Sequence, residues 1–176
     1  MPKRKVLITG MAGLIGRVIT ERLSDKYDLT GLDVKPAKGF VSHVADISDI
    51  DAIRPAFVGR QTVVHLAADP SADAPWDSIH KNDIVGTYNV MEAARQAGVE
   101  RAVFASSNHV VGYLPMKDEP YLAYFEQRDD DLPDPVPMIT AEAQRPDGFY
   151  AVAKAFGEIL STQRTSKFAE AKRQKI

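Results

Sequence analysis

A tyrosine and a lysine one helical turn apart are the residues of this chain whose types and spacing best fit proton transfer. Tyr150 and Lys154 stand in a segment, 147–166, that has helical periodicity, and residues four positions apart lie on one face of a helix. An ammonium beside a phenol stabilises the phenolate and lowers the tyrosine pKa, as a general base requires. The pair therefore predicts a general base, Tyr150, that is tuned by Lys154.

A serine at the end of a predicted strand is the second candidate. Ser107 follows the apolar run 102–105, and the carboxyl ends of parallel strands are where open α/β sheets bind ligands. Ser107 is thus placed to hydrogen-bond the reacting oxygen while Tyr150 moves its proton. The alternative is that Ser106 and Ser107 only end the strand and that the Tyr150 and Lys154 pair is ordinary helix surface.

The apolar residues of the 147–166 segment predict which face of this helix packs on the core. They recur at helical spacing, and Tyr150 and Lys154 point away from the centre of the stripe. Packing on that stripe does not explain either residue. The stripe consists of Phe149, Val152, Phe156, Ile159 and Leu160.

A glycine-rich turn, Thr9 to Gly16, predicts a phosphate-binding site. Gly10 allows a tight turn after the apolar run 6–8, Gly13 allows close approach to a pyrophosphate, and Gly16 allows the next helix to pack tightly. Unpaired N–H groups and the helix dipole then favour an anion at the helix start. Three glycines alone also occur in ordinary loops, but the preceding strand and the following amphipathic helix favour a bound dinucleotide.

Asp33, at the end of the second predicted strand, bears on the type of dinucleotide. It follows Gly16 at nearly the spacing at which a carboxylate meets the adenosine ribose, and it would repel a 2′-phosphate. This favours NAD over NADP, although Lys35 nearby could tolerate the extra phosphate. Asp46 and Ile47 follow the third strand where an adenine ring could be bracketed, while a helix N-cap at Asp46 or Ser48 is an equal alternative.

Alternating short apolar runs and helical patterns position these residues on an α/β fold, a doubly wound (Rossmann) and mostly parallel sheet with helices on both faces. Short, right-handed connections place the first strand near the middle of the sheet. The expected strands are 5–9, 28–33, 41–45, 62–67 and 101–106, and the expected helices are 13–24, 49–57, 77–97 and 147–166.

The chain is predicted to form one domain, residues 1–166, followed by a polar tail, 167–176. A proline-rich segment, 113–145, interrupts the alternation, and a long insertion of this kind is typical of a substrate loop or lid. Its acidic run, 129–131, predicts a solvated surface rather than a metal site.

Composition excludes several classes of function. A net charge of −2 over 176 residues offers no basic field for nucleic acid. The absence of cysteine excludes disulfides and thiolate chemistry, and no apolar stretch is long enough to span a membrane, so a cytoplasmic location is expected. No metal site is expected, because His43, His65 and His80 have no partner at metal-ligand spacing. His109, at the mouth of the last strand, is a candidate for substrate contact.

Five motifs together carry a resemblance to a known family. The chain resembles the extended short-chain dehydrogenases/reductases, the NAD-dependent epimerase/dehydratase family, over nearly all of residues 3–163. Within it, the segments 106–112 and 145–150 are most similar to uronate dehydrogenases and related NAD-dependent sugar dehydrogenases. The motifs are Thr-Gly-x-x-Gly-x-x-Gly at 9–16, His65-Leu66-Ala67-Ala68, the segment from Asn82 to Asn89, Ser106-Ser107, and Tyr150 with Lys154.

The resemblance implies a role for each matched residue. Ser107 and Tyr150 are implied to be the catalytic pair, Lys154 the pKa-tuning residue and nicotinamide-ribose ligand, and Asn108 and His109 substrate ligands with Ser107. It also implies a homodimer that forms through helices 77–97 and 147–166. The implied NAD-binding residues are Gly10, Gly13, Leu14, Ile15, Gly16, Asp33, Asp46, Ile47, Leu66, Ala67, Ala68, Asn82, Tyr150 and Lys154.

Two departures from the family pattern qualify the expected function. Ser107 and Tyr150 are further apart than in the uronate dehydrogenase pattern, so the insertion is expected to reshape the substrate pocket. The chain is also expected to lack the C-terminal substrate-binding portion. The leading hypothesis is an NAD-dependent oxidoreductase acting on a sugar or sugar acid, or its cofactor-binding part. The alternatives are a nucleotide-sugar epimerase or dehydratase, and an inactive truncated nucleotide-binding protein.

Overall fold

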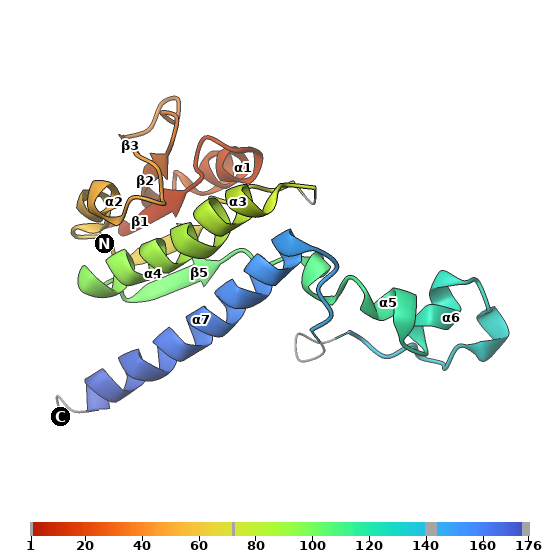
Figure 1. The fold of residues 1–176 in the computed structure, drawn as a ribbon. Coiled ribbons are helices and arrows are strands. Elements are labelled where there is room, and N and C mark those ends of the chain that lie inside the picture. The colour runs from red at the N-terminus through yellow and green to blue at the C-terminus, as the bar shows by residue number, and fades with distance from the viewer. Residues whose placement is uncertain (1, 72, 140–143, 174–176) are drawn as a thin grey trace.

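Five parallel strands form the sheet of the computed structural model, which describes residues 2–71, 73–139 and 144–173, with backbone only after residue 162. The strand order is β3-β2-β1-β4-β5, so β1 lies at the centre, and the predicted doubly wound α/β fold is confirmed (Figure 1). The strands are β1 (Arg4–Thr9), β2 (Tyr27–Asp33), β3 (Ser42–Val44), β4 (Thr62–His65) and β5 (Arg101–Phe104).

Helices cover both faces of this sheet, because alternate side chains of the strands are apolar on both sides. On β1, Leu7 packs with α2 (Ile50–Phe57) and α4 (Gly86–Gln96), which contribute Phe57 and Val90 to the same core. Val6 and Ile8 point to the opposite face and pack against α1 (Leu14–Leu23). Two clusters of buried residues, one on each side, therefore hold the central strands in place.

β4 and β5 end earlier than the sequence pattern predicts. Residues 66 and 67 turn out of the sheet because the Thr9 hydroxyl accepts hydrogen bonds from their backbone N–H groups, at 3.2 and 3.1 Å. Residues 105–107 follow the end of β5, and η2 (Asn108–Val111) begins directly afterwards, capped by Ser107. The segments that carry candidate site residues therefore lie just beyond the carboxyl edge of the sheet.

The predicted helix 77–97 is a run of three consecutive elements. These are α3 (Trp76–Ser78), the π-helix η1 (Ile79–Val85) and α4, which directly follows it. A π-helix has a wider turn than an α-helix and is frequent at functional sites. The sequence pattern did not predict this widening, which lies next to the site described below.

The last helix, α7 (Phe149–Arg173), extends past the expected end at residue 166. The predicted burial of its apolar stripe is wrong, because Phe149, Val152 and Ile159 are 54%, 44% and 61% exposed. Small residues face inward and allow close packing: a Cβ on Gly157 would lie 2.2 Å from the Phe104 ring. The buried side of the helix is formed by Ala151, Ala153, Lys154, Ala155 and Gly157.

Within the 113–145 insertion, residues 113–139 form a projecting arm that extends away from the sheet (Figure 1). It contains α5 (Leu114–Lys117), α6 (Tyr121–Phe125) and the short helix η3 (Asp129–Asp131), whose aspartates are exposed, as predicted for the acidic run. Beside η3, Arg128 forms ion pairs with Glu119, Glu126 and Asp131.

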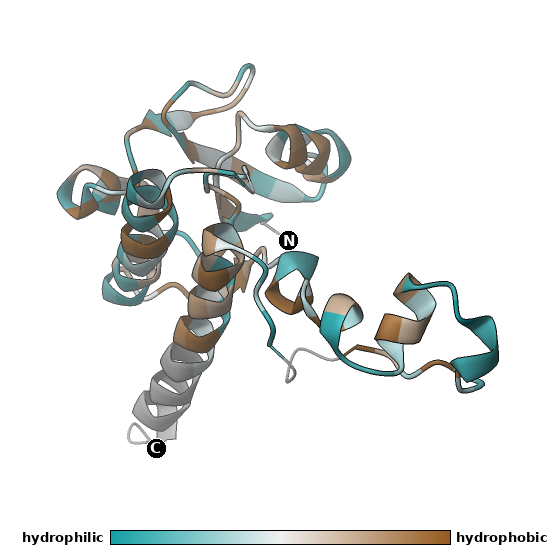
Figure 2. Cartoon of the chain, turned by 45° about the vertical axis from the view of Figure 1, so that its right-hand side comes forward, coloured by the Kyte–Doolittle hydropathy of each residue, from teal (hydrophilic) through white to brown (hydrophobic). Residues whose placement is uncertain are grey.

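Figure 2 shows hydrophobic residues both in the arm and along the coloured part of α7. Within the described part of the chain, no helix combines the length and the apolar character needed to cross a membrane.

Candidate active site

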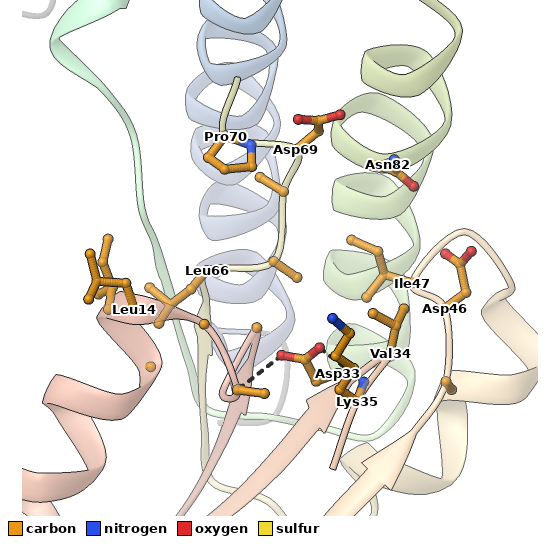
Figure 3. A pocket seen from close by; sticks show the side chains of 18 residues that line it. Leu14, Asp33, Val34, Lys35, Asp46, Ile47, Leu66, Asp69, Pro70 and Asn82 are labelled. Carbon is orange, nitrogen blue, oxygen red and sulfur yellow. Dashed lines mark hydrogen bonds between the residues drawn. The ribbon is translucent and has the colours of Figure 1, made fainter. Parts of the chain in front are cut away.

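A groove of about 750 Å³ opens at the carboxyl ends of β1, β2, β3 and β4. Figure 3 shows Leu14 on one side of it, Asp46 and Asn82 on the other, and Asp33 between them. All the residues predicted to bind the cofactor line this groove, except Tyr150 and Lys154. The sheet thus brings together residues that lie far apart in the chain.

The glycine-rich turn forms the floor of the groove. Gly10 adopts a φ of +71°, and a Cβ there would lie 2.8 Å from the backbone nitrogen of Ala67. A Cβ on Gly16 would lie 2.4 Å from the Met11 carbonyl oxygen. Gly13 is the N-cap of α1, and no side chain caps the helix, so backbone N–H groups of its first turn are available to an anion. The turn therefore fits the pyrophosphate of a dinucleotide.

Asp33 lies at the carboxyl end of β2, beside the glycine-rich turn. Its Oδ2 accepts a hydrogen bond from the Ala12 backbone N–H at 2.9 Å, and its Oδ1 accepts one from the Lys35 N–H at 3.2 Å (Figure 3). These contacts orient the carboxylate while each oxygen keeps acceptor capacity for a further donor. The arrangement fits recognition of ribose hydroxyls next to the phosphate site.

Asp46 and Ile47 line the wall of the groove opposite α1. The Lys81 ammonium, 2.8 Å from Asp46 Oδ2, and the Ser48 backbone N–H keep the pKa of the Asp46 carboxyl below its usual value. The expected N-cap at Asp46 or Ser48 is wrong, because Asp49 caps α2 by accepting hydrogen bonds from two backbone N–H groups. Asp46 Oδ1 instead accepts a hydrogen bond from the Ser48 backbone N–H at 2.9 Å, and Asp46 lines the groove.

Three candidate catalytic side chains meet beyond the end of β5. The Ser107 hydroxyl and the Tyr150 phenol are hydrogen-bonded to each other. The Lys154 ammonium lies 5.4 Å from the centre of the Tyr150 ring, and it donates a hydrogen bond to the Ala105 carbonyl oxygen at 2.9 Å. The Ser107 hydroxyl, the Tyr150 phenol and the Lys154 ammonium are thus gathered in one place, next to residues that leave the sheet edge.

The sequence predicted that Lys154 lowers the Tyr150 pKa, and this prediction is wrong. Burial, together with the charge of Asp83, raises the pKa of Tyr150 despite the lowering contribution of Ser107. Lys154 points toward the Ala105 carbonyl and the Phe104 ring, 5.0 Å from its ammonium, rather than into a contact with the phenol oxygen. Burial lowers the pKa of Lys154 in turn, and Asp83 opposes this shift.

Asp83 is a buried carboxylate that sequence reasoning missed. It lies in η1 with 2% of its surface exposed, and its Oδ1 accepts a hydrogen bond from the Asp69 backbone N–H at 2.7 Å. Its Oδ2 has no hydrogen-bond partner among the described residues. Burial raises the Asp83 pKa to about 6, while the charge of Lys154 acts in the opposite direction. Asp83 is therefore coupled electrostatically to both Tyr150 and Lys154.

The predicted substrate contacts, Asn108 and His109, begin η2 beside Ser107. The Ser107 hydroxyl donates to Asn108 Oδ1 at 3.4 Å and accepts from the His109 backbone N–H at 3.2 Å. The His109 ring packs edge-on against Tyr150, with 6.0 Å between ring centres. Both residues therefore border the candidate catalytic group, outside the dinucleotide groove.

Two of the other histidines, His65 and His80, have contacts that are not those of metal ligands. His65 is buried, and its ring nitrogens lie 2.7 Å from the Thr9 hydroxyl and 3.1 Å from the Thr87 hydroxyl, as expected of a satisfied core histidine. Burial lowers the His65 pKa to about 3. His80 stacks on Trp76. Within residues 2–71, 73–139 and 144–173, no group of three or more His, Asp or Glu could hold a metal ion.

Several groove residues were not predicted from the sequence. Their common signal is position, because each lies inside the glycine-rich turn or in the segment that follows a strand of the sheet. Lys35 was expected only as a cation near Asp33, and it also lines the groove. The other unpredicted lining residues are Ala12, Val34, Ala45, Asp69 and Pro70.

The family model described as "NAD dependent epimerase/dehydratase family" matches residues 6–170. The chain belongs to this family. A family relative, the L-arabinose 1-dehydrogenase (NAD(P)(+)) of Haloferax volcanii, is 41% identical over 89% of this chain and 59% of its own length. The uronate dehydrogenase of Agrobacterium fabrum is 36% identical over 95% of the chain and 58% of its own length.

Solved structures of the family show the same similarity. The crystal structure of uronate dehydrogenase from Agrobacterium tumefaciens superimposes with a TM-score of 0.75 at 36% identity, covering 96% of this chain and 58% of that one. A mutant of that enzyme in complex with NAD gives a TM-score of 0.74 at 35% identity, covering 94% and 57%. The chain thus spans less than two thirds of the length of these relatives.

Proposed function

We propose that this chain binds NAD and forms the catalytic part of a dehydrogenase that oxidises a sugar or sugar acid. The observation that carries the proposal is that Ser107, Tyr150 and Lys154 gather beyond the carboxyl end of β5, at the same edge of the sheet as a groove lined by the glycine-rich turn. The names of the family relatives, which include L-arabinose and uronate dehydrogenases, support this substrate class.

The residues of the chain divide the work between binding and proton transfer. Backbone N–H groups at the start of α1 hold the pyrophosphate, and Asp33 accepts hydrogen bonds from the adenosine ribose. Bound NAD supplies the acceptor for a hydride. Tyr150 takes the proton of the substrate hydroxyl, Ser107 hydrogen-bonds the same oxygen, and Lys154 holds a positive charge beside the phenol and contacts the nicotinamide ribose.

The decisive experiment is an assay of NADH formation with the full chain and a panel of aldoses, uronates and nucleotide sugars. Net NADH production from a free sugar supports the proposal. Conversion of a nucleotide sugar without net NADH formation identifies an epimerase or a dehydratase instead. Binding of NAD, measured by calorimetry, without any turnover leaves the chain as a nucleotide-binding protein.

We also propose that the chain pairs with a second copy through α7 and the helical run that contains α4. These helices contact each other, and the apolar residues Val152 and Ile159 are exposed on α7, while Trp76 and Tyr88 are exposed on the other run. Exposed apolar side chains on neighbouring helices favour an interface. A dimer in light scattering, lost in an Ile159→Asp variant that still binds NAD, is the expected result, and a wild-type monomer contradicts the proposal.

A further inference from the structure

A histidine and an aspartate that flank the 113–145 insertion meet beside Tyr150. His109 Nδ1 lies 2.7 Å from Asp147 Oδ2, and these side chains are 41% and 23% exposed. A carboxylate only accepts hydrogen bonds, so Nδ1 carries the hydrogen in this contact. Among the described residues Asp147 is the hydrogen-bond partner of the ring, and the second ring nitrogen, Nε2, is available to a ligand.

Gly112 provides independent evidence that the position of Asp147 is built into the fold. Gly112 has helical backbone angles, φ −61° and ψ −33°, which any residue can adopt. A Cβ at this position would nevertheless lie 2.0 Å from Asp147 Oδ2 and 2.5 Å from its Cγ. The backbone does not call for glycine here, and a methyl group added at Gly112 would displace the Asp147 carboxylate from its position.

Backbone hydrogen bonds tie the two ends of the insertion together at this point. The Arg145 N–H donates to the Val110 carbonyl at 2.8 Å, and the Tyr113 N–H donates to the Arg145 carbonyl at 3.0 Å. Asp147 follows two residues later, and α7 begins two residues after it, at Phe149. The contact with His109 is thus set by paired backbone rather than by a loose loop.

We propose that Asp147 is a positioning residue that fixes the His109 tautomer, so that Nε2 accepts a hydrogen bond from a second hydroxyl of the substrate. The inference rests on the proposed function, because Tyr150 then acts on one hydroxyl while His109 holds another. It narrows the substrate class to polyhydroxylated compounds in which a free hydroxyl lies near the one that is oxidised. In a histidine, the hydrogen bond made by one ring nitrogen commonly determines which nitrogen carries the proton.

The first test is nitrogen NMR of the full chain labelled at histidine, at a pH where the His109 ring is neutral. We expect the wild type to carry its proton on Nδ1, and Asp147→Ala to shift it to Nε2, the tautomer that free histidine favours. Asp130→Ala, an exposed aspartate of the arm, is the matched control and leaves the signal unchanged. This test needs no substrate, so it stays decisive if the proposed function fails. A wild-type ring protonated on Nε2 overturns the proposal.

A double-mutant cycle tests the role of Gly112. Gly112→Ala alone displaces the Asp147 carboxylate and shifts the His109 signal in the same direction as Asp147→Ala. In the Asp147→Ala background the space is free, and adding Gly112→Ala causes no further shift. Additive effects of the two substitutions contradict the argument. Far-ultraviolet circular dichroism of each variant checks that it is folded, and Asp147→Asn, which retains a hydrogen-bonding group, provides a second variant if Asp147→Ala does not fold.

Kinetics test the contact with the substrate. With the sugar that gives the highest activity, Asp147→Ala is expected to raise KM roughly 10-fold and to change kcat much less, in line with the loss of one oriented hydrogen bond. Replacing the sugar by a deoxy analogue that lacks the second hydroxyl should raise the KM of the wild type by a similar factor. The same replacement should change the KM of the His109→Ala variant little. Equal losses in both proteins overturn the assigned contact, whereas absence of turnover in the wild type counts against the proposed function alone.

Discussion

The dinucleotide groove is built differently from the candidate catalytic corner, by which we mean Ser107, Tyr150 and Lys154 together with Asp83. Backbone dominates the groove, where Gly10 and Gly16 leave no room for side chains and helix N–H groups face the ligand site. Side chains dominate the corner, where the charge of Asp83 affects the ionisation of both Tyr150 and Lys154. Substitutions in the groove should therefore alter fold and binding together, while substitutions in the corner should alter chemistry with little change in binding.

The largest expected effect is the loss of turnover in a Tyr150→Phe variant, which should alter the corner and leave the groove intact. Tyr150→Phe removes the group that moves the proton, so kcat should fall roughly 10²- to 10⁴-fold. Calorimetric affinity for NAD should stay within a few-fold of the wild type, because Tyr150 does not line the dinucleotide groove. Tyr124→Phe, at a residue 70% exposed in the arm, is the control and should retain activity. Full activity of the Tyr150→Phe variant would remove the assignment of Tyr150 as the base.

Gly16→Ala should show the opposite pattern. The added Cβ meets two backbone oxygens, of Met11 at 2.4 Å and of Gly10 at 2.6 Å, which cannot move without distorting the turn. We expect a loss of about 2 kcal/mol in the free energy of unfolding, measured with urea, and the loss of thermal stabilisation by NAD.

Gly39→Ala is the control for this substitution. Its φ is +83°, with open space around the position, so it should cost about 1 kcal/mol and leave NAD binding intact. If Gly16→Ala binds NAD normally, the turn does not hold the pyrophosphate.

Asp83→Asn probes the electrostatics of the corner. The folded state raises the Asp83 pKa from 3.8 to about 6, so this carboxyl destabilises the protein as the pH rises through that interval. The variant should be about 1–2 kcal/mol more stable than the wild type at pH 7, and this gain should disappear below pH 3.8. Urea unfolding at several pH values measures the difference.

The same variant should change the pH profile of turnover. The Asp83 charge raises the Tyr150 pKa, so its removal should shift the rise of kcat with pH to lower pH. Asp73→Asn, at an exposed residue, is a control that should leave the profile unchanged. An unshifted profile in Asp83→Asn means that the carboxylate does not influence the base.

Asp33→Asn is expected to have the smallest effect. The amide oxygen can still accept from Ala12, so the turn should stay in place, but the charge that repels a 2′-phosphate is lost. Affinity for NAD should fall roughly 10-fold, and the preference over NADP should narrow by at least that factor. Calorimetry with both dinucleotides measures the ratio. If the ratio of the NAD and NADP affinities is unchanged, Asp33 does not discriminate between the two dinucleotides, and Lys35 is the next residue to test.

The sequence predicted the sheet and the groove well because both depend on local patterns. Short apolar runs marked the strands, and residues that follow strand ends converge at one edge whatever the intervening loops do. The buried face of α7 was predicted wrongly because close packing there uses alanines and Gly157 against Phe104, and a search for large apolar residues selects the opposite face.

The side-chain partnerships could not be predicted from the sequence for a different reason. His109 and Asp147 are 38 positions apart and meet only because the insertion closes on itself. Asp83 resembles an ordinary polar residue of a helix, and only tertiary packing shows that it is buried. Such contacts depend on the path of the backbone between distant segments, which residue spacing does not encode.

The π-helix between Trp76 and α4 has a consequence for register. Each residue of an α-helix advances by about 100° around the axis, and a wide turn accommodates an extra residue without rotating the helix after it. Val90 and Ala93 can thus stay seated on the sheet while Asp83 faces the corner and Asn82 the groove. Deleting one residue within Ile79–Val85 should leave the helix intact in circular dichroism yet swing its first turns, with Trp76, away from α7.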